Sequence, residues 1–201
     1  MAVIVAGGVG WLARPGAERE PQATAATPRL AEPVARATPS PPPPSCAEVS
    51  RAFAPRTINV PGVKRNVPVV RPPRDAAAVP GVAPLTTAGK SVFAWDREQG
   101  IRPGDPAGNV LLNAHTWPDG SALGNRLLSG LQLGDRIVVR GAGARLCYRV
   151  TERVEVPAER DMPRYYDTEG SPQLAIIVCS GRRLGPGVWE KRTVWFASPS
   201  A

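Results

Sequence analysis

The chain has 201 residues, with 25 Lys and Arg against 17 Asp and Glu, a formal net charge of +8 and 24 prolines. This length fits one folded domain plus a tail. The basic side chains are overwhelmingly Arg and are scattered along the chain. Because no basic and aromatic residues interleave in a base-reading pattern, nucleic-acid binding is not expected, and attraction to an anionic surface is the better use of the charge.

The first 45 residues do not read as part of a folded domain. Residues 1–14 are mostly apolar, but they are fewer than the ~20 residues that span a membrane and lack the basic start of an export signal. They are either a truncated anchor, if the true start lies upstream, or a weak export signal. Residues 15–45 are rich in Pro and Ala and are expected to form a disordered linker. An apolar start, a Pro-rich linker and a folded remainder, in that order, predict a membrane-anchored, extracytoplasmic domain over residues 46–201.

The three cysteines leave two interpretations open. Cys46, Cys147 and Cys179 have no metal-ligand spacing and only one histidine accompanies them, so no metal site is expected. Outside the cytosol, Cys46 and Cys147 could pair and leave Cys179 free. Alternatively, Cys147 is a small buried hydrophobic residue and Cys46 belongs to the tail.

Short strands, turns and little helix are expected in the first half of the domain. Prolines within the first two strands indicate edge or bulged strands. In chain order, the expected elements are a short helix over 47–53, strands over 57–63 and 67–70, a Pro-rich loop over 71–87, a strand over 90–96 and a turn over 102–106.

The middle of the chain predicts further strands. The apolar run 109–115 ends at His115, the only histidine. Leucines 127, 128, 131 and 133 lead to a Gly-Asp turn, and two alternating runs, 136–140 and 145–156, flank a Gly-rich hairpin signal. Seven or eight short strands point to a mainly β fold, a closed β-barrel.

The last stretch brings a thiol and a cation together. The apolar run Leu174–Val178 reads as a buried strand that delivers Cys179, closed by Ser180 and Gly181. After a loop over 182–187, a second strand is expected with Arg192 at its start. A cation beside a cysteine favours the thiolate and can bind an oxyanion.

These three residues lie in segments that resemble sortases, the cysteine transpeptidases of Gram-positive cell surfaces. The resemblance covers residues 57–197 and extends to turns typical of the actinobacterial, class F-like branch. Its motifs are Val110–His115, Leu174–Cys179, Trp189–Arg192, Arg102–Asp105 and Leu131–Asp135.

The resemblance implies an eight-stranded sortase-type barrel with short helices and a transpeptidation mechanism. Cys179 would be the nucleophile that cleaves a Leu-Pro-X-Thr-Gly-like sorting signal between Thr and Gly through a thioacyl-enzyme. His115 would be the general acid and base, and Arg192 would stabilise the oxyanion or the substrate. The partners would be sorting-signal peptides of surface proteins and an amine acceptor of a cell-wall precursor. No cofactor is needed, and a monomer is expected.

Two positions depart from the family pattern. Val178 stands where the family commonly has Thr before the cysteine, and Ala114 stands where it commonly has Gly before the histidine. Both are candidates for the substrate groove, as is Arg182, which together with Arg183 could reach the same rim as Arg192. The alternative function is an inactive or mainly hydrolytic sortase-like surface protein. Some sortases bind calcium through acidic loops, which raises the question for Glu152, Glu155, Glu159 and Asp161, although solvent-facing charges are the simpler interpretation.

Overall fold

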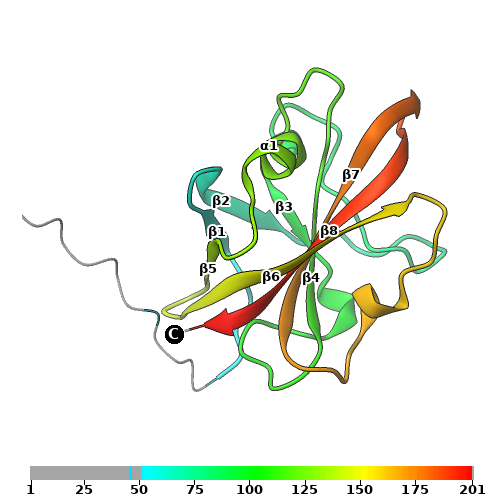
Figure 1. Ribbon diagram of the computed structural model, residues 1–201. Coiled ribbons are helices and arrows are strands. Elements are labelled where there is room, and N and C mark those ends of the chain that lie inside the picture. The colour runs from blue at the N-terminus through cyan, green and yellow to red at the C-terminus, as the bar shows by residue number, and fades with distance from the viewer. Residues whose placement is uncertain (1–45, 47–50, 201) are drawn as a thin grey trace, which may run out of the picture. The chain divides into compact units, whose positions relative to one another are not determined.

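The computed structural model describes residue 46 and residues 51–200 (Figure 1). The expectations for residues 1–14 and 15–45, and most of the expected helix over 47–53, lie outside the described residues. No helix within the described residues is long and apolar enough to cross a membrane. The strands are β1 (Thr57–Val60), β2 (Lys64–Val70), β3 (Phe93–Trp95), β4 (Asn109–Ala114), β5 (Arg136–Arg140), β6 (Arg145–Pro157), β7 (Gln173–Gly185) and β8 (Val188–Ser200).

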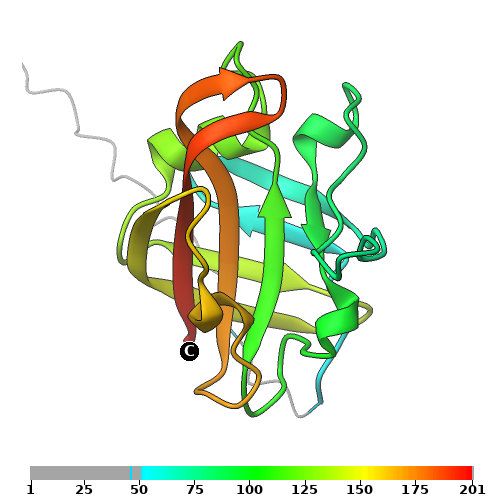
Figure 2. The ribbon, with the colours of Figure 1, turned by 90° about the vertical axis from the view of Figure 1, so that its right-hand side faces the viewer.

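The eight strands form a closed barrel in the order β1-β2-β3-β4-β7-β8-β6-β5. The mainly β, eight-stranded barrel predicted from the sequence is therefore confirmed. Closure pairs β1 with both β2 and β5, so the Pro-containing first strands are not edge strands; β1 carries an irregularity between Ile58 and Val60. Two neighbouring pairs are parallel, β2 with β3 and β4 with β7. Figure 2 shows β4 ending beside β7.

The barrel interior is filled by one apolar cluster. Alternate residues of the strands point inward, as the period of two in a strand requires, and Ile58, Phe93 and Trp195 are completely or almost completely buried. One end of this cluster is covered by a helix, α1 (Leu123–Gly130), whose Leu123 and Leu127 are buried with the following Leu131. The sequence interpretation missed this helix, although leucines four residues apart lie on one helical face.

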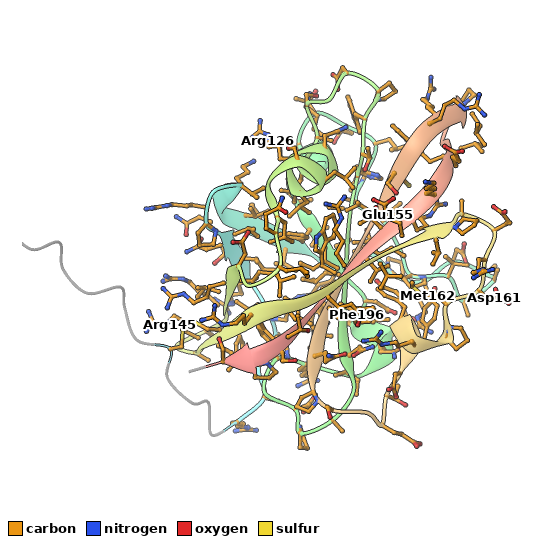
Figure 3. All side chains as sticks on the ribbon, viewed as in Figure 1. Arg126, Arg145, Glu155, Asp161, Met162 and Phe196 are labelled. Carbon is orange, nitrogen blue, oxygen red and sulfur yellow. A yellow bond between two sulfur atoms is a disulfide. The ribbon has the colours of Figure 1, made fainter. Side chains whose placement is uncertain are left out.

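A second cluster lies on the outer side of β4, β7 and β8. It contains Leu111, Val194 and Phe196 together with Tyr165 of a short 3-10 helix, η3 (Pro163–Tyr166). Met162, which precedes η3, packs against this cluster, and Met162 and Phe196 are both labelled in Figure 3. Because both faces of β4 and of β7 as far as Val178 are covered, these stretches are almost continuously apolar, as is typical of buried parallel strands.

The β7–β8 hairpin is longer than expected. Ser180 and Gly181 do not end the strand: β7 continues to Gly185, and only Pro186 and Gly187 separate it from β8. Gly181 adopts a positive φ of 73°, and the register shifts between Ser180 and Arg183. A left-handed glycine therefore makes a bulge here where a strand end was predicted. The hairpin projects beyond the end of β4 (Figure 2).

Cys46 and Cys147 form a disulfide, with 5.6 Å between their Cα atoms, and Cys179 is free. Cys147 lies on β6 opposite Ser200 of β8. Because β6 runs from there to Val156, which pairs with Arg192, the disulfide lies at the opposite end of these strands from Arg192.

Candidate active site

The candidate site lies where the parallel pairing of β4 with β7 ends. The paired residues of β4 and β7 run from Asn109 and Gln173 to Ala114 and Val178. His115 and Cys179 directly follow the last paired residues, Ala114 and Val178. Arg192 of β8 lies directly opposite Cys179 across the antiparallel β7–β8 pair. Residues far apart in the sequence therefore meet because the barrel makes their strands neighbours.

All three side chains line one pocket of about 240 Å³. Its other walls come from the segment after β2, from η3 and from the ends of β4 and β7. The lining residues are Val79, Pro80, Val82, Asn113, Ala114, His115, Tyr165, Tyr166, Ile177, Val178, Cys179 and Arg192.

The Cys179 thiol lies in a setting with two opposed electrostatic influences. Burial raises the pKa of this thiol, because the thiolate loses hydration, while the positive charge of Arg192 acts in the opposite direction. None of the ion pairs found among the described residues includes Arg192, whose guanidinium donates instead to the backbone oxygen of Lys191 at 3.1 Å. Its charge can therefore act on the thiol and on an oxyanion formed beside it.

The imidazole of His115 is held by the segment after β2. Its Nε2 lies 2.6 Å from the backbone oxygen of Ala83, and Nδ2 of Asn113 donates to the backbone oxygen of Gly81 at 2.9 Å. Because a carbonyl oxygen only accepts, the proton lies on Nε2 in this arrangement. Nδ1 of the neutral ring is then the nitrogen left to accept a proton.

The predicted groove candidates fall in different places. Ala114 and Val178 both line the pocket and also pack in the barrel core. Arg182 is exposed on the projecting part of the hairpin, does not line this pocket, and donates its backbone N–H to Glu190 at 3.0 Å.

Several pocket residues were missed by the sequence interpretation. Val79 and Val82 lie in a segment that its proline content marked only as a loop, and no motif pointed to Tyr165 or Tyr166. The Tyr165 hydroxyl donates to the backbone oxygen of Leu112 at 3.2 Å, which fixes η3 to β4. The one sequence feature that could have indicated them is the pair of adjacent aromatic residues, Tyr165 and Tyr166, just before a turn.

The acidic residues considered for calcium do not gather into one site. Glu152 pairs with Arg164, and Glu155 pairs with Arg153 and Lys191. Across residue 46 and residues 51–200, no group of three or more His, Cys, Asp or Glu side chains is placed to hold a metal ion.

The sequence matches a known protein family over most of the folded domain. The model of the sortase domain matches residues 58–200. The chain belongs to the sortase family. Sortases are cysteine transpeptidases, and the matched residues include His115, Cys179 and Arg192. A search of curated proteins gave no match.

Solved sortase structures share the fold at low sequence identity. Sortase C1 of Streptococcus agalactiae, in complex with MTSET, has a TM-score of 0.55 and 12% identity, with 72% of this chain and 68% of that chain covered. Sortase C-1 of Actinomyces oris has a TM-score of 0.54 and 18% identity, covering 72% and 73%. Sortase A of Listeria monocytogenes has a TM-score of 0.53 and 20% identity, covering 75% and 89%. These similarities support the barrel fold.

Proposed function

We propose that this sortase cleaves a Leu-Pro-X-Thr-Gly-like sorting signal between Thr and Gly and transfers the acyl chain to an amine on the cell surface. The observation that carries the proposal is that His115, Cys179 and Arg192 line the same pocket. A thiol, an imidazole and a guanidinium in one pocket can serve as nucleophile, acid and base, and oxyanion stabiliser in acyl transfer through a thioester.

In the first half of the reaction, the Cys179 thiolate attacks the carbonyl carbon of the Thr residue. Arg192 stabilises the oxyanion that develops on the carbonyl oxygen. Its charge also offsets part of the cost that burial imposes on the thiolate. When the Thr–Gly bond breaks, the His115 imidazolium gives a proton to the leaving amine and a thioester links the Thr carbonyl to Cys179.

In the second half, neutral His115 takes a proton from the incoming amine, which attacks the thioester carbonyl. An amide forms and the Cys179 thiolate departs. The backbone oxygen of Ala83 holds the Nε2–H of the ring, so Nδ1 is the nitrogen that we assign to the proton transfers. The site needs no cofactor for these steps.

The proposal includes the setting of the enzyme. The substrates are sorting-signal peptides of surface proteins, and the acceptor is an amine of a cell-wall precursor. We place the enzyme outside the cytoplasm, held at the membrane and acting as a monomer.

Mass spectrometry of the full chain tests this function. The chain is incubated with a panel of Leu-Pro-X-Thr-Gly peptides, alone and with an added amine, beside the variants Cys179→Ala and His115→Ala. We expect a thioacyl adduct that Cys179→Ala abolishes, and an amide product when the amine is present. An adduct that persists in Cys179→Ala would refute the assignment of the nucleophile. Acid as the sole product at saturating amine would favour the hydrolytic alternative.

A further inference from the structure

We propose that Thr116 is a positioning residue whose hydroxyl, held in place by the start of α1, sets the imidazole of His115 against the thiol of Cys179. This inference rests on the proposed function, in which the two side chains exchange a proton. It concerns a residue that does not line the pocket and whose hydroxyl contacts the backbone oxygen of Cys179.

The first observation is how the β4–β7 pair ends. The paired residues stop at Ala114 and Val178, one position before His115 and Cys179. Beyond this point, Oγ1 of Thr116 donates to the backbone oxygen of Cys179 at 2.6 Å. A side-chain hydrogen bond therefore continues the connection between the two strands past the last backbone pair. It joins the residue after the histidine to the cysteine itself.

The second observation is that α1 fixes the chain on the other side. The backbone N–H of Gly124 donates to the backbone oxygen of His115 at 2.8 Å. Asn125 accepts from the backbone N–H of Trp117 at 2.9 Å and donates to its carbonyl at 3.0 Å. The residues His115, Thr116 and Trp117 are therefore each held by a specific hydrogen bond.

The close approach of α1 explains why a glycine stands at position 124. A Cβ atom there would lie 2.5 Å from the backbone oxygen of His115 and 2.6 Å from Oγ1 of Thr116. Real Cβ atoms do not approach other heavy atoms this closely, so any larger residue would displace His115 or Thr116. The packing of α1 and the hydrogen bond of Thr116 therefore both fix the position of the segment His115–Thr116.

The consequence for catalysis is geometric. Removing the hydroxyl releases Cys179 from the segment that carries His115, and misplacing a reacting group by about 1 Å can reduce the rate by a factor of about 100. Thr116→Val preserves the branched shape and removes only the donor. We expect this variant to acylate about 10- to 100-fold more slowly, with little change in the KM for peptide. Thr116→Ser keeps the hydroxyl and should stay within about threefold of the parent rate.

A matched control separates positioning from general stability. Thr151 on β6 also donates its hydroxyl to a backbone oxygen, that of Phe196, at 3.1 Å, and it does not line the pocket. Thr151→Val therefore also removes a hydrogen bond from a hydroxyl to a backbone oxygen, at a more exposed position of the barrel than Thr116. We expect it to acylate at the parent rate. An equal loss of rate in Thr151→Val and Thr116→Val would overturn the proposal.

A second readout requires no sorting peptide. The rate of iodoacetamide alkylation of Cys179 is measured against pH in the parent, His115→Ala, Thr116→Val and Thr116→Ser. If the hydroxyl positions the imidazole, the Thr116→Val profile moves toward that of His115→Ala, while Thr116→Ser follows the parent. A Thr116→Val profile identical to the parent refutes the proposal, as does a His115→Ala profile identical to the parent. Failure to acylate any peptide would count against the proposed function alone, because alkylation still decides the role of Thr116.

Discussion

Removing the Cys46–Cys147 disulfide should weaken the fold without changing the reactivity of Cys179. The two cysteines are 101 residues apart in sequence. Closing a loop of that length restricts the unfolded chain by about 4.7 kcal/mol in the chain-entropy model. Cys46→Ala is the suitable change, because Cys147 is buried and its thiol can stay in the core.

The expected result is a decrease of up to about 4.7 kcal/mol in the free energy of unfolding. For a domain of this size, that corresponds to a fall in Tm of about 10 to 20 °C. Urea and thermal unfolding of the parent and of Cys46→Ala measure both quantities. A reducing agent should destabilise the parent and leave Cys46→Ala unchanged, which serves as the control.

The site should not respond to this change, because it lies far from the disulfide. Cys147 is opposite Ser200, eight residues along β8 from Arg192, which is about 26 Å at the rise of a strand. Alkylation of Cys179 in the folded variant should therefore proceed at the parent rate. Equal stabilities of the parent and Cys46→Ala, within about 1 kcal/mol, would contradict the loop-closure reasoning.

Two further predictions test the electrostatics and the scaffold of the pocket. Arg192→Gln removes the charge that lowers the pKa of Cys179, so that pKa should rise and the pH profile of alkylation should move to higher pH. Arg192→Lys keeps the charge and should follow the parent profile. An unmoved profile in Arg192→Gln would contradict the electrostatic role of Arg192. Tyr165→Phe removes the buried donor to the backbone oxygen of Leu112 and should lower the free energy of unfolding by about 1 kcal/mol in urea. No loss of stability in Tyr165→Phe would mean that this hydrogen bond does not stabilise the attachment of η3.

The sequence was most informative where both faces of a strand are buried. The runs Val110–Leu112 and Leu174–Val178 are almost continuously apolar, so a strand could be predicted at each, together with the positions of His115 and Cys179 just beyond these runs. The helix α1 was missed because it is only eight residues long and contains Gly124 and Asn125, which usually mark turns.

Other features could not be predicted because backbone atoms create them. The partner of His115 is a carbonyl oxygen of Ala83, and any residue would supply that oxygen. Gly181 has the same sequence signature whether it ends a strand or forms a bulge, and the choice depends on whether the partner strand continues beside it. Tertiary pairing, absent from local sequence, therefore determined the length of the hairpin.

The valine that stands before the cysteine, where the family more usually has Thr, fits its buried position. Val178 is 2% exposed and belongs to the barrel core, where a hydroxyl would need a buried partner. A valine avoids that cost. A hydroxyl that contacts the backbone oxygen of the cysteine comes instead from Thr116, which is buried, follows His115 and has that oxygen as its partner. This hydrogen bond links the two segments that carry the proposed chemistry.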